Sequence, residues 1–492
     1  MLRSLPLSLA LLTAFFTLLT HTAVATPPIA AVASPTSPPA TEVSVAVDRR
    51  VELLTIVARL AGAREFLMPN SQSPYAERVA AHFGPFQNHA AVKAYQAIRA
   101  EHGASYDAIA SLALHLDGVP TLAERIPFDR SPPRLDARWA VEPTRAFLVA
   151  LRAFVVESKA EAFFAAEQPF YDHCAAKVAP VLAKANAVEW FDRFFGSKPA
   201  ASYQAIPGLL CGGGNYGVGV RFLDGAPEEI RPVLGIYRWD AEGLPAYGER
   251  DVETYVHELC HSYTNVIVDR HLDILRPAGT RLYPIVAQRM SRMAYGSWET
   301  MMYETFVRAC VVRYLADVQS PEAAAKEASV QRETGFAWVP DVAERLATYA
   351  KARDRYPTLD AFLPEIVAVL DAKAESMVTE AAAAEKNAPK LLGITPPNGA
   401  KDVAKDLTTM VLRFDRPMST KSWSFVGSKD DVPEMVGAPA WSADATTLTA
   451  TVKLVPGRTY HFWLNSERFN GFRAANGAPL SSVEVTFTIE GE

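Results

Sequence analysis

The sequence contains 492 residues, of which 49% are apolar, and carries a formal net charge of −6 at pH 7. This length exceeds what one hydrophobic core normally serves, so two or three domains are expected. The 49 Lys and Arg residues nearly balance the 55 Asp and Glu residues and form no basic cluster, which argues against nucleic acid as a partner.

The N-terminal segment has the pattern of a signal peptide. Arg3 precedes the apolar run "LPLSLALLTAFFTLLT", and Ala23 and Ala25 form a small-x-small cleavage signal. An uncleaved membrane anchor is the alternative, but the run is short for a membrane span. The sequence therefore predicts a signal peptide over residues 1–25, a secreted or periplasmic location, and no membrane span after cleavage.

A Pro/Ser/Thr/Ala-rich stretch over residues 26–46 predicts a disordered linker, and a mainly helical domain is expected over 47–386. Its first helix carries apolar residues on one face, at Val51, Leu54, Val57 and Leu60. Further helical segments are expected near 74–102, 104–114 and 142–185, and again from residue 251 onwards. Gly-rich and β-branched residues between 203 and 240 predict a small β-sheet inside this mainly α (α+β) domain.

The segment 389–492 shows the alternating pattern of β-strands in "TTMVLRF", "TLTATVKL", "TYHFWL" and "VEVTFTI". About 100 residues of this pattern favour a sandwich of roughly seven strands. The segment resembles a bacterial immunoglobulin-like (Ig-like) domain through the turn at Pro396–Gly399, "FDRPM", Trp441, "PGRTY" and Phe487. The resemblance implies a spacer or binding module, and hence a component of the cell surface or wall.

The stretch "DVETYVHELCHSYTN" holds the candidate site. In a helix capped by Asp251, His257 and His261 lie one turn apart on the same face and can both bind one zinc ion. Glu258 lies beside that face, where it can act as the general base for a zinc-activated water. A buried side is provided by Val256, Leu259, Cys260 and Tyr263. The alternative is a surface helix with a stripe of polar residues.

A catalytic zinc also needs a third protein ligand. Thr264 and Ile267 stand where a HExxHxxGxxH site requires Gly and His, and His271 is a weak candidate. A later helix capped by Ser297 offers two glutamates. Glu299 falls in its first turn, where the helix dipole explains an acid, whereas Glu304 falls mid-helix among apolar residues.

Glu304 is therefore predicted as the third ligand, in the arrangement of gluzincin metallopeptidases. Arg308, one turn further on, is a candidate to hold its carboxylate. The alternative is an ordinary surface ion pair between these two residues.

The region from about residue 47 to 320 resembles a family of exported bacterial proteins described only as a domain of unknown function. The resemblance is carried by "VELLTIVARLAG", "WFDRFFG", "GGGNYGVGV", "HELCHSYTN" and "YETFVRA". It implies a zinc site at His257, Glu258, His261 and Glu304, and it implies no substrate.

The remaining candidates carry weaker signals. An oxyanion-stabilising donor could be Tyr283, Tyr295, Tyr303, His271 or Arg308, and Tyr295, in the turn before the second ligand helix, is predicted for this role. "CGGGNYG" at 211–217 could be a strand edge that receives a peptide, or a loop with positive φ.

The wide spacing of the cysteines is compatible both with free thiols and with one or two disulfides. The cysteines are Cys174, Cys211, Cys260 and Cys310. Cys260 is not expected as a metal ligand, because it faces away from the histidine face, but it could pair with Cys310.

These patterns predict an exported zinc-dependent metallopeptidase that cleaves peptide bonds in a peptide or protein substrate. One alternative is a non-catalytic surface binding or scaffold protein with structural zinc. Another is a hydrolase that cleaves a cell-wall amide. The sequence carries no signal for the cleavage preference.

Overall fold

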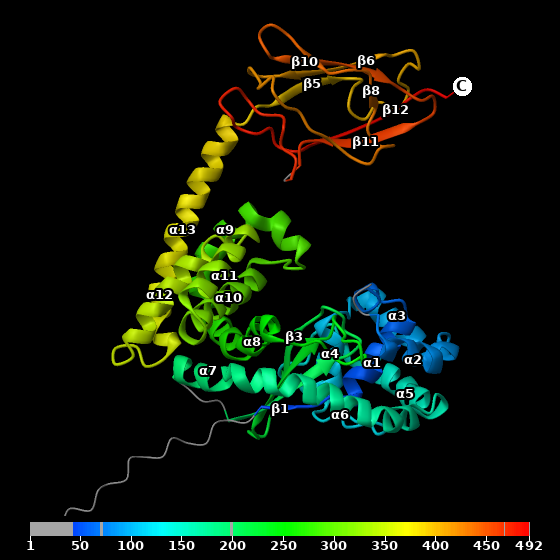
Figure 1. The fold of residues 1–492 in the computed structure, drawn as a ribbon, viewed down its shortest axis with the longest axis vertical. Coiled ribbons are helices and arrows are strands. Elements are labelled where there is room, and N and C mark those ends of the chain that lie inside the picture. The colour runs from blue at the N-terminus through cyan, green and yellow to red at the C-terminus, as the bar shows by residue number, and fades with distance from the viewer. Residues whose placement is uncertain (1–42, 69–71, 197–199, 467, 492) are drawn as a thin grey trace, which may run out of the picture. The chain divides into compact units, whose positions relative to one another are not determined.

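The computed structural model describes residues 43–68, 72–196, 200–466 and 468–491. The predicted signal peptide and residues 26–42 of the predicted linker lie outside these ranges. Within them, no helix combines the length and the apolar content that crossing a membrane requires. The described chain has a helical part that contains a small sheet and a β-rich C-terminal part (Figure 1).

The first helices contribute to one hydrophobic core, of which Val51 is the first buried residue along the chain. They are α1 (Arg49–Leu60), α2 (Pro74–Phe83), α3 (Ala90–His102), α4 (Asp107–Leu114), α5 (Val141–Glu157), α6 (Ala160–Ala185) and α7 (Ala187–Phe195). Asp48 caps α1 by accepting hydrogen bonds from the backbone of its first turn.

Two of the predicted helical segments are each divided into two helices. The segment 74–102 breaks at Gly84 and Pro85, where a short 3-10 turn replaces the α-helix because proline has no N–H to donate. The segment 142–185 breaks between α5 and α6, where Lys159 takes a left-handed conformation.

A four-stranded sheet follows, with the strand order β1-β2-β4-β3. The strands are β1 (Ser44–Val45), β2 (Ala201–Gly208), β3 (Tyr216–Val220) and β4 (Glu228–Gly235). β1 and β4 pair with β2 in parallel, whereas β3 runs antiparallel to β4 with Gly217 opposite Pro232. β3 is therefore an edge strand, and it packs against helix α8 (Val252–Arg270).

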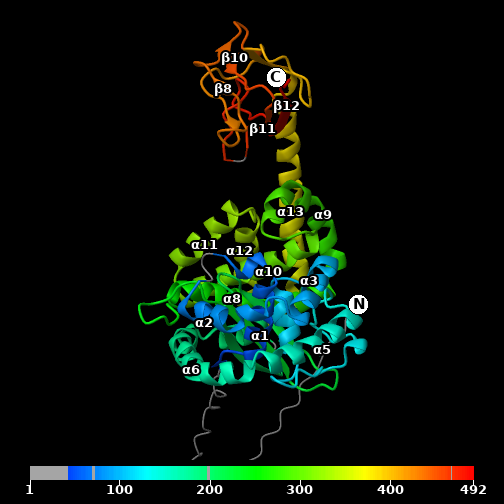
Figure 2. The same cartoon turned by 90° about the vertical axis from the view of Figure 1, so that its right-hand side faces the viewer.

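The helices after the sheet form a second group. They are α8, α9 (Leu272–Arg292), α10 (Trp298–Val318), α11 (Pro321–Glu333), α12 (Val339–Lys351) and α13 (Leu359–Asn387). α10 contacts α8, α9, α11 and α12, while α13 packs on α9 and α12 (Figure 2). α10 is thus the central helix of this group, and its position brings it against α8.

The β-rich part has its own core, centred on residues such as Leu412, Leu448 and Phe462. One sheet has the order β5-β6-β10-β8 with β9 paired to β10, and the other has the order β12-β11-β7. The strands are β5 (Leu391–Thr395), β6 (Thr409–Phe414), β7 (Phe425–Val426), β8 (Glu434–Met435), β9 (Ala440–Trp441), β10 (Thr447–Lys453), β11 (Thr459–Leu464) and β12 (Val483–Thr488). The predicted seven strands become eight in the described residues, because the two-residue strands are too short to show an alternating pattern.

Candidate metal centre

Helix α8 brings the two histidines together. Its residues include no proline or glycine, and its buried side is formed by Val256, Leu259, Cys260 and Tyr263, as the pattern predicts. The rings of His257 and His261 lie edge to face, with centroids 5.0 Å apart and planes at 76°. Their side chains keep 20% and 16% of their surface exposed, so both remain reachable from solvent.

Asp251 does not cap this helix with its side chain, which corrects the sequence-based expectation. Its carboxylate instead accepts hydrogen bonds from the Gly248 N–H and the Tyr237 hydroxyl, at 2.7 and 2.9 Å. It also forms an ion pair with Arg238 at 2.6 Å. Asp251 therefore fastens the preceding loop to the start of α8.

Helix α10 supplies the third member of the group. Ser297 caps it by accepting a hydrogen bond from the Thr300 N–H, as predicted, and Glu304 lies buried two turns into the helix. The Glu304 carboxylate oxygens lie 3.5 Å from Nε2 of His257 and 3.5 Å from Nε2 of His261. One ligand atom from each of these three residues lies within 4.8 Å of the others, so the group could hold a metal ion.

Glu299 and His271 do not belong to this group. Glu299 lies in the first turn of α10, as the sequence suggests. The His271 ring lies 3.0 Å from a carboxylate oxygen of Asp360. Glu304, the glutamate that the burial argument favours, is thus the one that lies in the three-residue group.

Two polar side chains orient residues of the candidate metal group formed by His257, His261 and Glu304. Asn265, one turn after His261, has its Oδ1 3.2 Å from Nδ1 of that histidine. This contact favours a proton on Nδ1, which leaves Nε2 free to bind a metal. Arg308 donates to Oε2 of Glu304 from Nε and Nη2, at 3.1 and 3.0 Å, and holds the carboxylate toward the histidines.

Arg308 also connects the site to two further residues. Its Nη2 donates to the Tyr295 hydroxyl at 2.9 Å, and its Nη1 donates to the Gln331 side chain at 2.9 Å. Its guanidinium lies 4.6 Å from the centre of the Phe336 ring. The surface ion pair considered from the sequence is therefore replaced by a buried network around Glu304.

Glu258 follows His257 in α8, is buried, and is close enough to Glu304 for the two carboxyl groups to influence each other. The backbone N–H of Gly217 in β3 hydrogen-bonds its carboxylate. A Cβ at Gly217 would lie 2.6 Å from the Glu258 carbonyl oxygen and 2.9 Å from Cβ of His261, so only glycine fits there. The close approach of β3 to α8 depends on this residue.

The burial of the site changes its acid–base properties. Burial lowers the pKa of His257 to about 3, so its imidazole is neutral at physiological pH. Burial alone would raise the pKa of Glu304, but the neighbouring histidines and Arg308 hold it below its usual value. Burial and the Glu304 carboxylate raise the pKa of Glu258 well above its usual value.

The tyrosines proposed as oxyanion donors have different partners. The Tyr295 hydroxyl hydrogen-bonds Glu304 and accepts from Arg308, so it lies beside the metal-binding group. Tyr283 donates to the Tyr295 carbonyl at 3.1 Å, and Tyr303 donates to Asp269. Tyr295 is thus the tyrosine that hydrogen-bonds Glu304.

Asn265 and Gln331 were not identified as site residues from the sequence. Asn265 has a signal there, since it continues the i+4 spacing of the two histidines. Gln331 comes from α11, which is distant along the chain. Gly217 lies in the stretch 211–217, for which a strand edge was one of two expectations, and it lies in the edge strand β3.

All four cysteines are buried free thiols. Cys260 on α8 and Cys310 on α10 lie close enough for their thiols to interact, but both are free, so the pairing of these two cysteines considered from the sequence is not formed as a disulfide. Cys260 lies outside the three-residue metal-binding group.

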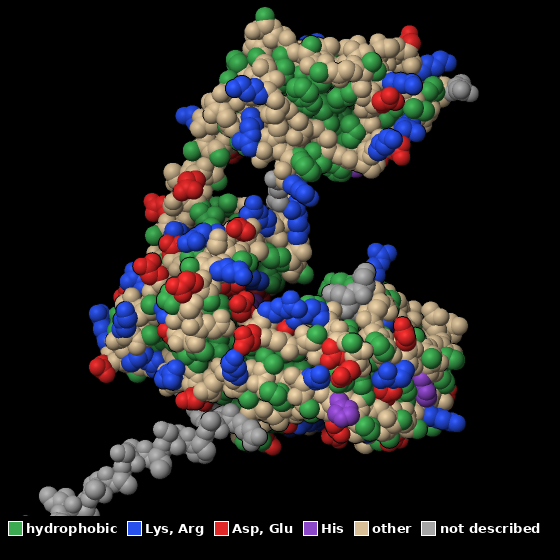
Figure 3. Space-filling view, viewed as in Figure 1, with side chains coloured by type: hydrophobic (Ala, Val, Ile, Leu, Met, Phe, Trp, Pro, Cys, Tyr) green, Lys and Arg blue, Asp and Glu red, His purple; other side chains and the backbone are tan. Residues whose placement is uncertain are grey.

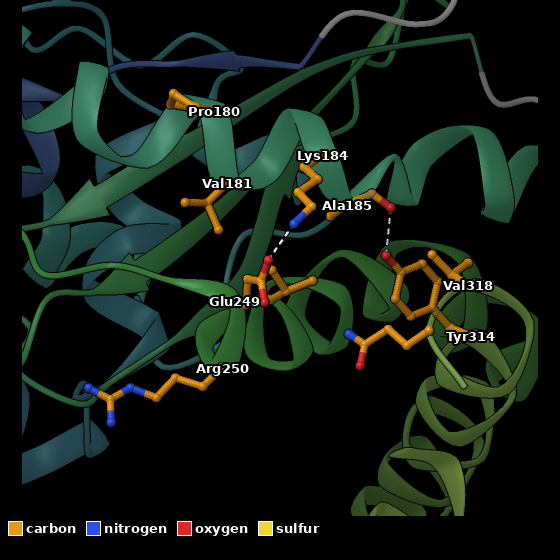
Figure 4. Close-up of a pocket in the computed structure, with 10 residues that line it drawn as sticks. Pro180, Val181, Lys184, Ala185, Glu249, Arg250, Tyr314 and Val318 are labelled. Atoms are coloured by element: carbon orange, nitrogen blue, oxygen red, sulfur yellow. Dashed lines mark hydrogen bonds and ion pairs between the residues drawn. The ribbon is translucent and has the colours of Figure 1, made fainter. Parts of the chain in front are cut away.

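A cavity of about 420 Å³ reaches the candidate metal group at His261, and His261, Ser262, Asn265 and Asp269 from α8 line one side of it. A larger cavity of about 700 Å³ lies between α6 and α10 and reaches α8 only at Val252 (Figure 4). It contains the ion pair of Lys184 with Glu249 and none of the metal-binding residues. On the face drawn in Figure 3, Lys and Arg side chains lie among Asp and Glu side chains.

Residues 43–369 match the family model described as Domain of unknown function (DUF4932), and residues 385–489 match the bacterial Ig-like domain. The first match covers more than half of the chain, so the chain belongs to the DUF4932 family. Neither family description names an activity or a metal. The second match makes the chain multidomain, with a helical N-terminal region and a β-rich Ig-like region.

The chain is also similar to solved structures. CopC from Methylosinus trichosporium OB3b is 19% identical over 21% of this chain and 95% of that chain, with a TM-score of 0.17. The bacterial S-layer protein SbsC is 17% identical over 52% of this chain, with a TM-score of 0.16; the match covers 35% of its longer solved form and 61% of its N-terminal part. TM-scores this low carry no argument about fold or function. No curated protein matches the chain.

Proposed function

We propose that this member of the DUF4932 family is a zinc-dependent hydrolase that cleaves peptide bonds. His257, His261 and Glu304 would bind the metal, and Glu258 would act as the general base. The observation that carries the proposal is the convergence of the three ligand atoms within 4.8 Å, from α8 and α10, with the buried Glu258 next to His257 in α8.

The chemistry of the donor set fits a divalent cation. Nε2 of each histidine lies 3.5 Å from a Glu304 oxygen, so three possible ligand atoms converge on one small space. With the Nδ1 of His261 directed at Asn265, the Nε2 of this histidine presents its lone pair to that space. Two imidazoles and one carboxylate form a common protein ligand set for catalytic zinc, which keeps one further position for water or substrate.

Zinc bound there supplies a Lewis acid for the scissile carbonyl and the attacking water. The Glu258 carboxylate accepts the proton that the water loses as it attacks the carbonyl carbon. When the C–N bond breaks, the same carboxyl group returns the proton to the leaving amine. The Gly217 N–H holds Glu258 in place during both transfers.

Tyr295 is proposed to stabilise the oxyanion that develops during attack. Its oxygen accepts a hydrogen bond from the Arg308 Nη2, which leaves the hydroxyl proton as the group it donates. The hydroxyl lies beside Glu304. With Glu304 holding a cation, the Tyr295 hydroxyl would be available to donate to a substrate oxygen.

The edge strand β3 supports a peptide as the substrate. Gly217 lies opposite Pro232, which has no N–H to donate across the ladder. The two residues therefore form a non-hydrogen-bonded pair, in which the N–H and C=O of Gly217 point away from β4. Gly219 therefore also directs its N–H and C=O outward, away from β4. The outward N–H and C=O of Gly217 are already bonded by Glu258 and Arg134, so a substrate in extended conformation would hydrogen-bond the outward groups of Gly219.

An exported location is also part of the proposal. It is supported by the signal-peptide pattern of residues 1–25 and by the Ig-like domain, a module common on exported proteins. This domain would serve as a spacer or attachment module at the cell surface or wall.

The test combines metal analysis with the Glu258→Gln variant. Purified protein should contain about one zinc per chain, and the variant should retain this zinc but lose peptide hydrolysis by at least ~100-fold. Glu299→Gln on α10 is the control and should leave both properties unchanged. If wild type binds zinc but cleaves neither a peptide library nor cell-wall peptides, the metal is structural and the scaffold alternative holds.

A further inference from the structure

The cavity beside the metal-binding group lies between α8 and the edge strand β3. Its walls include Gly217, Val218 and Gly219 from β3 and His261, Ser262, Asn265, Val266 and Asp269 from α8. Its volume of about 420 Å³ falls within the range of small-ligand pockets. It is thus large enough to receive substrate side chains next to the proposed reaction centre.

Helix α8 presents a continuous polar stripe to this region. His257, His261, Asn265 and Asp269 follow one another at intervals of four residues, so they share one face of the helix. Asp269 lies eight residues beyond His261, which is roughly 12 Å along the helix axis. An extended peptide covers that distance in three or four residues, and in fewer when a long side chain spans part of it.

Most charged groups of the cavity are neutralised within two ion-pair sets. The first joins Arg138 to Asp107 and Asp136, and the second joins Glu228 to Arg134 and Arg221. The first set has a net charge of −1 and the second of +1, so together they cancel. Arg134 is also held by the Gly217 carbonyl and the Ser262 hydroxyl, each at 3.2 Å.

Asp269 is the exception. It is exposed, it accepts a hydrogen bond from the Tyr303 hydroxyl, and no Lys or Arg lies within 4.0 Å of it in the described chain. Its neighbour Arg270 is already paired with Asp360 at 2.6 Å. Glu299, which also lies near Tyr303, adds a second negative charge to the surroundings.

We propose that this cavity is a subsite for a cationic side chain of the substrate, a lysine or an arginine, and that Asp269 is its specificity-determining residue. The inference rests on the proposed function, since it names the substrate class of the same site. The cation would pair with the Asp269 carboxylate while the peptide backbone lies along β3.

The test compares peptides that are identical except for one lysine or its uncharged isostere norleucine, placed two to four residues from the cleaved bond. Wild type should prefer the lysine peptide by ~2- to 5-fold in kcat/KM, as expected for a partly exposed ion pair. Asp269→Asn should remove the preference by lowering kcat/KM for the lysine peptide toward the value for the norleucine peptide. Asp273→Asn, which removes an exposed carboxylate on α9 outside the cavity lining, should change neither value.

Binding provides a second readout that needs no turnover. In the zinc-loaded Glu258→Gln background, the lysine peptide should bind more tightly than the norleucine peptide by a similar factor, and less so at high salt. Equal affinity for both peptides, or a preference that survives Asp269→Asn, overturns the inference while leaving peptide hydrolysis intact. Absence of hydrolysis by wild type refutes the proposed function instead.

Discussion

Gly217 offers the sharpest test of how the site is assembled. Replacing it with alanine puts a Cβ 2.6 Å from the Glu258 carbonyl oxygen and 2.9 Å from Cβ of His261. Both distances are shorter than an ordinary van der Waals contact. One partner is a backbone oxygen of α8 and the other is a Cβ attached directly to that backbone, so neither atom can rotate away. Strand β3 and helix α8 must therefore move apart.

The loss of stability in Gly217→Ala can be estimated from the effect of overpacking a protein core. Inserting one methyl group into a tightly packed contact lowers the free energy of unfolding by about 1–3 kcal/mol. The same displacement moves the Gly217 N–H away from Glu258. A misplacement of about 1 Å in a catalytic group can reduce the rate by ~100-fold. Gly217→Ala should thus lose activity far more than it loses stability.

The assay measures urea unfolding, zinc content and peptide hydrolysis for Gly217→Ala. Gly118→Ala is the matched control, because a Cβ at Gly118 meets no atom within 4 Å. The control should behave as wild type. Wild-type stability together with wild-type turnover in Gly217→Ala would refute the close packing of β3 on the site.

Three further changes test other residues. Glu304→Gln should lower zinc affinity by at least tenfold, whereas Glu299→Gln should not, as measured by competition with a chelator. Tyr295→Phe should reduce kcat by ~10- to 1000-fold with little change in KM, if its hydroxyl stabilises the oxyanion; an unchanged kcat argues against that role. Burial raises the pKa of Glu52 to about 8, so the folded state keeps a proton that the unfolded state loses above about pH 4.5. Stability should therefore fall between about pH 5 and pH 8, by on the order of 3 kcal/mol, and Glu52→Gln should flatten this dependence in urea titrations.

Local patterns predicted much of the candidate site. The four-residue spacing of His257 and His261 places them on one face of any helix, whatever surrounds it. Glu304 could be preferred over Glu299 because an acid among apolar residues needs a cation, whereas an acid in a first turn does not. The Ser297 cap follows from the same local rules.

Other features lay beyond local patterns. Asp251 stands in the position of a helix cap, but Arg238 and the Gly248 N–H compete for its carboxylate. The division of the long helical segments depended on a proline in one case and on a left-handed residue in the other. A periodicity argument averages over such single residues and therefore merged each pair of helices.

The amino-acid sequence alone determined which residue types could bind a metal and which face of each helix they occupy, because these follow from a spacing of a few residues. Only the tertiary structure decided that α10 packs on α8, so that Glu304 lies 3.5 Å from both histidines. It also decided that Arg308 joins Glu304 to Gln331, and that Gly217 reaches Glu258 from another element. The physical reason is that these contacts depend on the packing of elements far apart in the chain, which no local periodicity records.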